Sequence, residues 1–229
     1  MKVLLAGATG AIGVPLLSAL AAAGHEVVAV VRDPARRRIV TDRGAHAVVA
    51  DVLDRDALLR ALDGHAADVV MHQATALRGA SRRLRPDDPT LALRDRGTAH
   101  LLDAARAVGA RRFVTQSLIT GYGYRDHGDR VLTEDDEFGV HVGTVADLVT
   151  DSSVATESQV FAADGIEGFA LRYGMFYGRN AFSDLFADLM RKRAPVLDTT
   201  MRVSHAKATR DLGWTPVHPS VPDGLEDMR

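Results

Sequence analysis

The sequence predicts an α/β protein in which helices cover both faces of a doubly wound parallel sheet. Short apolar runs of strand length alternate with segments whose apolar residues recur at helical spacing. The chain also opens with a strand-like run, Val3 to Ala6, that stops at a glycine and passes into a helical pattern at Ala11. Both features are typical of βαβ units, because parallel strands need crossover connections and lie buried beneath them. We expect right-handed crossovers and the strand order 3-2-1-4-5-6.

The individual elements follow from apolar runs, capping residues and breakers. Pro34 ends the second strand, and Gly64 closes a helix that Asp54 caps. Expected strands are Val3–Ala6, Val27–Val31, His46–Ala50, Asp68–His72, Arg112–Thr115 and Phe169–Tyr173. Further helices are expected at Thr90–Val108, Ala146–Ala163, Ala181–Arg193 and Ser204–Leu212. Segments 77–89 and 121–143 are polar or rich in glycine and acidic residues, so they are expected to be loops.

The overall composition excludes several classes of function. The chain has 229 residues, 46% of them hydrophobic, which is enough for one α/β core. A net charge of −2 at pH 7 gives no reason to expect a nucleic-acid partner. The chain has no cysteine, so disulfides and thiolate metal sites are excluded, and the histidine spacing indicates no metal site. No apolar run is long enough to span a membrane, and we expect a cytoplasmic protein.

Three glycines mark the turn between the first strand and the first helix. Gly7 allows a tight turn, Gly10 lets a ligand approach the backbone, and Gly13 lets the helix pack closely on the strand. The N-terminus of the helix then directs unpaired N–H groups and its positive dipole end at whatever fills the turn. This arrangement favours a pyrophosphate, so we predict a dinucleotide site.

Several motifs resemble the extended short-chain dehydrogenase/reductase superfamily, specifically its NAD-dependent epimerase/dehydratase group. They cover nearly the whole chain: Gly7–Gly13 (TGxxGxxG), Ala50–Val52, Met71–Thr75, Phe113–Gly123, Leu171–Gly178 (LRxxNxYG) and Lys207–Pro216 (KARxxLGWxP). The resemblance implies a Rossmann-type sheet followed by a small substrate lobe. It also implies that the cofactor is bound by Gly7, Thr9, Gly10, Ala11, Ile12, Gly13, Asp51, Val52, Gln73, Ala74, Thr75 and Tyr173.

The end of the second strand bears on the choice between NADP and NAD. Members of the group that prefer NAD carry an acid there for the ribose hydroxyls, and Val31 holds that place in this chain. The next residue, Arg32, can pair with a 2′-phosphate, aided by Arg36 or Arg37. The alternative is a solvated arginine cluster at the start of a helix. We predict NADP as the cofactor, with NAD as the alternative.

The catalytic residues of the group are missing. Its members use a Ser or Thr after the fifth strand and a Tyr-x-x-x-Lys on the next helix, but alignment places Leu118, Val149 and Ser153 at these positions. The usual proton relay is therefore absent. Ser117 and Tyr122, near the end of the fifth strand, are our candidates for a replacement proton donor, although Tyr122 can equally serve to shape the loop.

The substrate lobe is also shorter than the resemblance implies. Members of the group have further strands and helices where Val196 passes directly to Leu197 in this chain. Either most of the lobe has been lost, or a segment between residues 196 and 197 is missing from this sequence. We expect the second, because Lys207–Pro216 would otherwise have no lobe to pack against. We assign residues 1–180 to the NAD(P)-binding domain and 181–229 to the remnant of the lobe.

Two classes of function agree with these features. The first is an NAD(P)-dependent oxidoreductase, epimerase or dehydratase that acts on a nucleotide sugar or a small biosynthetic carbonyl. Without a base, reduction is easier to support than alcohol oxidation. The second is a non-catalytic NADP(H)-binding redox sensor similar to the NmrA-like regulators. The resemblance also implies a homodimer that pairs the helices at 90–108 and 146–163.

Overall fold

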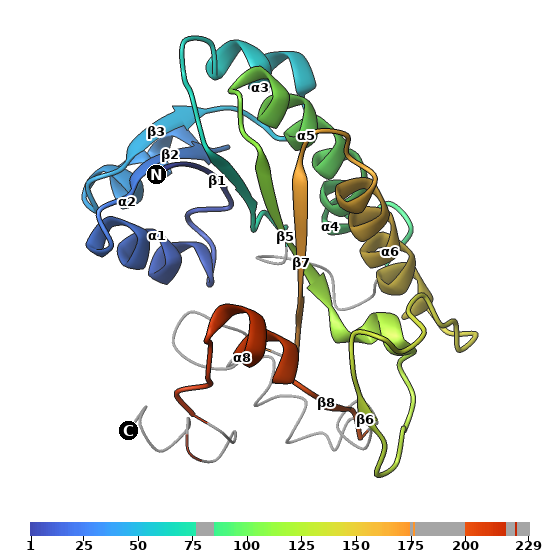
Figure 1. Cartoon of the computed structure of the whole chain (residues 1–229). Coiled ribbons are helices and arrows are strands. Elements are labelled where there is room, and N and C mark those ends of the chain that lie inside the picture. The colour runs from blue at the N-terminus through green and yellow to red at the C-terminus, as the bar shows by residue number, and fades with distance from the viewer. Residues whose placement is uncertain (77–84, 175, 177–199, 219–222, 224–229) are drawn as a thin grey trace.

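A parallel six-stranded sheet forms the centre of the protein, with the strands in the order β3-β2-β1-β4-β5-β7 (Figure 1). The computed structural model describes residues 1–76, 85–174, 176, 200–218 and 223. The strands are β1 (Lys2–Ala6), β2 (Glu26–Val31), β3 (His46–Val49), β4 (Val69–His72), β5 (Arg112–Leu118) and β7 (Glu167–Tyr173). The predicted fold class and strand order are confirmed.

The strand order reverses on either side of β1. Ala6, the last residue of β1, is paired with Val30 of β2 and with His72 of β4. The segments that leave these three strands therefore begin at the same edge of the sheet. A ligand crevice is expected at this kind of switch point.

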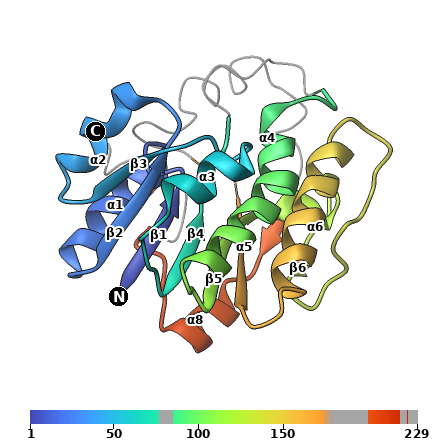
Figure 2. The same cartoon turned by 90° about the horizontal axis from the view of Figure 1, so that it is seen from above.

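Helices cover both faces of the sheet (Figure 2). On one face, α1 (Gly13–Ala22) and α2 (Arg37–Thr41) pack against the sheet around Leu5, Leu17 and Val40. On the other face, α3 (Arg55–Ala61), α5 (Thr98–Ala107) and α6 (Asp147–Phe161) enclose a second core that includes Phe113 and Val160. Burial on both faces explains why the runs Val3–Ala6 of β1 and Val27–Val31 of β2 are apolar throughout.

The helix predicted at Thr90–Val108 is not regular. It consists of α4 (Pro89–Ala92), a π-helical turn η2 (Leu93–Gly97) and α5. Side-chain donors from outside the turn bind its carbonyls: Oγ1 of Thr156 donates to the Arg94 carbonyl over 2.5 Å, and Nε2 of Gln159 donates to the Asp95 carbonyl over 3.2 Å. The sequence pattern missed the irregularity because these donors belong to α6, about 60 residues farther along the chain.

The fifth strand is longer than predicted. It was expected to end at Thr115, but β5 continues to Leu118, which pairs with Tyr173 of β7. A 3₁₀ turn, η3 (Ile119–Tyr122), follows directly. Ser117 therefore lies within the strand rather than in the loop after it.

The last described part of the chain contains α8 (Ala206–Leu212), as the pattern at Ser204–Leu212 predicted. The sequence did not predict a short parallel ladder between β6 (Val131–Leu132) and β8 (Arg202–Val203), which lies partly in the segment expected to be a loop. The predicted helix at 181–193, the 180/181 domain boundary and the 196/197 junction fall outside the described residues, as does most of the loop at 77–89. Among the described helices, none is long and apolar enough to cross a lipid bilayer.

Candidate functional site

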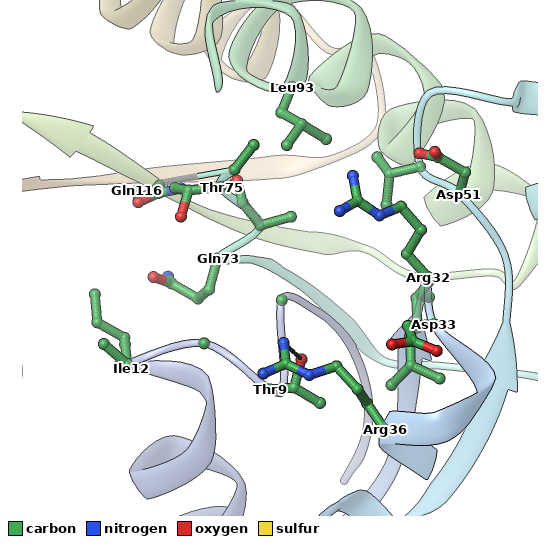
Figure 3. Close-up of a pocket in the computed structure, with 18 of the residues that line it drawn as sticks. Thr9, Ile12, Arg32, Asp33, Arg36, Asp51, Gln73, Thr75, Leu93 and Gln116 are labelled. Atoms are coloured by element: carbon green, nitrogen blue, oxygen red, sulfur yellow. Dashed lines mark hydrogen bonds between the residues drawn. The ribbon is translucent and has the colours of Figure 1, made fainter. Parts of the chain in front are cut away.

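A cavity of about 580 Å³ opens at the carboxyl edge of the sheet, where the strand order reverses (Figure 3). Segments that follow β1, β2, β3 and β4 form most of its wall. The residues that line it are Gly7, Thr9–Ile12, Val30–Asp33, Arg36, Ala50–Val52, Gln73–Ala76, Leu93, Gln116 and Phe176. We call the part formed by Val30–Asp33, Arg36 and Ala50–Val52 the β3 side, and the part formed by Ile12, Gln73–Ala76, Gln116 and Phe176 the β5 side.

The glycine turn has the geometry that its spacing predicted. Gly7 has a φ of +90°, and a Cβ there would lie 2.5 Å from the backbone nitrogen of Ala74. A Cβ at Gly13 would lie 2.7 Å from the carbonyl carbon of Ala8, so α1 packs against the turn only because residue 13 has no side chain. At Gly10 the nearest atom would be the Gly7 carbonyl oxygen at 3.2 Å, which leaves the cavity side of this residue open.

The N-terminus of α1 borders the same turn. Ile12 occupies the N-cap position and provides no side-chain hydrogen bond to the first turn of the helix. Pro15 lies within that first turn, where its missing N–H removes no intrahelical hydrogen bond. The uncapped helix end, next to an open Gly10, is a suitable site for an anion.

Charged side chains gather on the β3 side of the cavity (Figure 3). The Oδ1 atom of Asp33 accepts a hydrogen bond from the Ala35 N–H over 2.9 Å, and Oδ1 of Asp51 accepts one from the Leu53 N–H over 2.9 Å. Nη1 of Arg36 donates to Oγ1 of Thr9. The exposed Arg32 forms no hydrogen bond or ion pair with any residue that the structure describes. It is therefore a cation that a ligand can use.

The β5 side of the cavity is different in character. In the described part of the chain, all ionisable lining residues belong to the β3 side, and the β5 side presents amide, hydroxyl and apolar groups. Its Gln73 has a buried Oε1 atom without a hydrogen-bond partner among the described residues. A buried polar atom of this kind costs free energy unless a ligand or water pairs with it.

Tyr173 lies behind this side rather than on it. Its hydroxyl is hydrogen-bonded with the Gln73 side chain, and burial raises the pKa of the phenol. Its ring contacts that of Phe176 edge-on, with the centroids 5.2 Å apart. Tyr173 therefore supports two lining residues without lining the cavity itself.

Eleven of the thirteen predicted cofactor-binding residues line this one cavity; the others are Gly13, which packs beneath the turn, and Tyr173. Sequence reasoning missed Asp33, Leu93, Gln116 and Phe176. Gln116 precedes the predicted Ser117 on β5, and strand alternation could have indicated that only one of the two faces the cavity. Leu93 gave no signal, because a helical apolar residue is normally part of the core.

The two predicted proton donors do not line the cavity. Ser117 is fully buried, and its Oγ has no partner among the described residues. Tyr122 is 2% exposed, and its hydroxyl accepts a hydrogen bond from Nη1 of Arg172 over 2.9 Å. Burial is the main cause that raises the pKa of this phenol. The catalytic role of both residues stays a prediction.

Arg172 connects Tyr122 to α6. Its Nε and Nη2 atoms donate to the two carboxylate oxygens of Glu157, over 2.9 and 2.8 Å. Its guanidinium also lies 3.8 Å from the centroid of the Phe138 ring. This cluster joins β7, η3 and α6, and it explains the burial of the phenol without any catalytic role.

The helix α6 carries no acid or base where the resemblance places the tyrosine and the lysine. Val149 and Ser153 occupy these positions, and Oγ of Ser153 donates back to the Val149 carbonyl over 2.9 Å. The Ser153 hydroxyl is thus engaged within its own helix. Neither residue lines the cavity.

A dinucleotide fits the lining of this cavity. The glycine turn admits a pyrophosphate beside an uncapped helix, Arg32 offers a cation, and the Oε1 atom of Gln73 requires a partner.

Comparisons with known proteins agree with this geometry. Residues 7–140 match a family model described as NAD(P)H-binding. A curated Streptomyces protein, 3-diazoavenalumate denitrifying reductase, is 46% identical over 183 residues, which cover 78% of this chain and 57% of that protein. The chain spans little more than half the length of the curated relatives it matches.

Solved structures show the same fold. A UDP-galactose 4-epimerase matches with a TM-score of 0.64 and 25% identity, over 85% of this chain and 64% of that one. A short-chain dehydrogenase/reductase superfamily protein from Agrobacterium tumefaciens, with bound NAD, matches with a TM-score of 0.58 and 26% identity, over 75% of this chain and 48% of that one. The chain therefore belongs to the NAD(P)H-binding proteins of the extended short-chain dehydrogenase/reductase superfamily.

Proposed function

We propose that the protein is an NADPH-dependent reductase that removes the diazo group of a small substrate as dinitrogen. The observation that carries this proposal is the chemistry of the β5 side of the cavity. None of the described residues that line this side has an ionisable side chain. The name of the Streptomyces relative, at 46% identity, supplies the substrate class. This proposal replaces the nucleotide sugar or biosynthetic carbonyl expected from the sequence.

The lining residues divide naturally between the parts of the cofactor. Gly7–Gly13 and the start of α1 would hold the pyrophosphate, and Asp51 with Val52 would contact the adenosine. Arg32 would pair with the 2′-phosphate, which favours NADPH over NADH. Gln73 and Thr75 would receive the nicotinamide half on the β5 side.

The chemistry suits a site without a proton donor. When bound, reduced nicotinamide would supply a hydride to a substrate that carries its diazo group as a diazonium cation. A C–H bond would form at the carbon that bears this cation while the C–N bond breaks, and the electron pair of the C–N bond would leave with dinitrogen, so that the hydride balances the positive charge. This replacement takes no proton from the protein. A carbonyl substrate, by contrast, leaves an alkoxide that needs a proton, and sugar epimerisation through alcohol oxidation needs a base.

The residues of the β5 side would then bind and shield the substrate rather than ionise. Ile12 and Phe176 contribute apolar surface, and Gln73 and Thr75 contribute hydrogen-bonding groups. Figure 3 shows Leu93 next to Thr75, with its side chain directed into the cavity. An apolar wall that excludes water protects a reactive diazonium group from attack by solvent.

A homodimer remains our proposal for assembly. A groove between α4 and α6 supports it, because Leu91, Ala92, Leu148 and Ala155 present small and apolar side chains there. The charged residues of the groove are Arg96 and four aspartates, Asp87, Asp88, Asp95 and Asp151, so the apolar residues rather than the charges carry this proposal.

Turnover of 3-diazoavenalumate with NADPH tests the proposed reaction. We expect consumption of NADPH, release of dinitrogen, and transfer of deuterium to the product carbon from NADPH deuterated at the transferred position but not from heavy water. Reactions without protein and with Gly10→Ala measure uncatalysed reduction. Turnover of carbonyl compounds but not of the diazo substrate would overturn the assignment. Tight NADPH binding with no turnover of either class would instead favour the redox sensor.

A further inference from the structure

The segment that leaves β4, residues 73–76, forms one wall of the cavity, and side chains hold its backbone in place. Nδ1 of His72 accepts a hydrogen bond from the Ala74 N–H over 3.3 Å. Nε2 of Gln116 donates to the Ala74 carbonyl over 3.1 Å. Oγ1 of Thr90 accepts from the Ala76 N–H over 3.2 Å. The wall is thus held by three side chains from β4, β5 and α4.

These side chains are themselves buried. His72 is 0% exposed, and Gln116 and Thr90 are each 3% exposed. Their positions are fixed by the packing around them, so they can hold residues 73–76 in one conformation before a ligand arrives. Such preorganisation reduces the entropy lost on binding.

His72 also ties this wall to the helical turn that begins at Leu93. Because its Nδ1 accepts from Ala74, its Nε2 carries the proton and donates to the Leu93 carbonyl over 3.1 Å. Burial lowers the pKa of the imidazole to about 4, so the ring is neutral at physiological pH. Leu93 is the first residue of the π-helical turn Leu93–Gly97, and its side chain lines the cavity.

We propose that His72, Thr90 and Gln116 are positioning residues that preorganise residues 73–76 for the nicotinamide half of the cofactor. The inference rests on the proposed NADPH-dependent function and assigns none of the three to the chemical step. The hydrogen bonds that they make with residues 73–76 act on the β5 side. Loss of one of them therefore weakens binding of the nicotinamide half and leaves the adenosine half unaffected.

The matched pair Thr90→Val and Thr90→Ser gives the sharpest test. Valine keeps the shape of threonine but cannot accept the Ala76 N–H bond, whereas serine keeps the hydroxyl. Calorimetric titration of each variant with NADPH, and with 2′,5′-ADP as the adenosine half, separates the two ends of the cavity. We expect Thr90→Val to weaken NADPH binding about five-fold. Binding of 2′,5′-ADP should change less than two-fold in Thr90→Val, and Thr90→Ser should restore most of the NADPH affinity.

Thr98→Val is the control for a general loss of stability. Oγ1 of Thr98 donates to the Arg94 carbonyl over 2.6 Å, and Thr98 is as buried as Thr90 but forms no hydrogen bond with residues 73–76. It should lower Tm without changing the affinity for either ligand. Equal weakening of NADPH and 2′,5′-ADP in Thr90→Val, or no change in either, would overturn the positioning role.

The outcomes also separate this inference from the proposed function. If the parent protein binds neither ligand, both proposals fail. If it binds NADPH and shows the expected difference between the two ligands but releases no dinitrogen, only the reductase assignment fails. His72→Asn, which retains an acceptor for Ala74 but cannot reach Leu93, is a second variant should Thr90→Val not fold. We expect it to weaken NADPH binding and to spare 2′,5′-ADP; equal losses would overturn the inference.

Discussion

Nη1 of Arg36 donates a hydrogen bond to Oγ1 of Thr9 over 3.2 Å and so joins the segment after β2 to the glycine turn after β1. Arg36 thus already has a hydrogen-bond partner within the protein. Arg32 lies on the same wall of the cavity and has no hydrogen-bond partner among the described residues. Sequence reasoning considered both arginines for a 2′-phosphate. The geometry favours Arg32 as the primary partner, with Arg36 as a support for the turn.

Replacing Arg32 should therefore change the choice of cofactor. A charge-assisted hydrogen bond contributes about 1.5–3 kcal/mol, so Arg32→Asp should weaken NADPH binding by about ten-fold or more. NADH should bind as well as before or better, because a carboxylate at this place can accept hydrogen bonds from the ribose hydroxyls. Calorimetric titration with both cofactors measures the difference. Arg38→Asp is the control, because Arg38 is exposed and does not line the cavity; equal losses for both cofactors would count against the assignment.

The glycines of the turn should separate folding from binding. A Cβ at Gly13 meets the backbone of Ala8, so Gly13→Ala should lower the free energy of unfolding by about 1–3 kcal/mol. At Gly10 a Cβ would meet only the Gly7 carbonyl oxygen, at 3.2 Å, so Gly10→Ala should lower Tm less than Gly13→Ala does. Its methyl group stands where the pyrophosphate approaches, and NADPH affinity should fall about ten-fold or more. Thermal melts and titrations of both variants check this, and a large drop in Tm for Gly10→Ala would contradict it.

The predicted proton donors discriminate between substrate classes. If the protein reduces a carbonyl and Ser117 or Tyr122 supplies the proton, Ser117→Ala or Tyr122→Phe should slow single-turnover hydride transfer by about 10²–10⁴-fold. For a diazo substrate we expect no such loss, since both groups lie outside the cavity and no proton is needed. Ser117→Ala should leave stability nearly unchanged, because the hydroxyl it removes has no described partner. A hundred-fold slower turnover of the diazo substrate in either variant would argue against direct replacement of nitrogen by hydride.

The buried His72 should make stability depend on pH. Its folded-state pKa is lowered from 6.5 to about 4, chiefly by desolvation, so the unfolded chain takes up the proton first as the pH falls. The stability that neutral His72 contributes is fully present above pH 6.5 and is lost as the pH falls towards 4. The loss amounts to about 3 kcal/mol. Denaturant unfolding at a series of pH values should show a shallower decline for His72→Asn, and His46→Gln, at an exposed histidine, should follow the parent.

Local sequence determined the sheet and the glycine turn. The runs Val3–Ala6 and Val27–Val31 are apolar throughout, and the strand order follows from the right-handed crossovers between them. The glycines at residues 7, 10 and 13 identify the turn because their need for space is a property of the local backbone. The neighbouring segments Asp51–Val52 and Gln73–Thr75 lie at the same edge for the same reason, since each directly follows a strand.

Only the tertiary structure decided which side chains the site uses. Pairing with β7 extends β5, so that Ser117 lies within the buried strand. Arg172 of β7 donates a hydrogen bond to the Tyr122 hydroxyl. Both predicted donors therefore lie outside the cavity. Bonds from His72 and from α6 accompany the π-helical turn that places Leu93 on the cavity wall. These contacts join residues from about 20 to about 60 positions apart in the chain. The spacing of apolar residues, with a period of two in strands or 3.6 in helices, does not predict such contacts, because they form only when the strands and helices pack together.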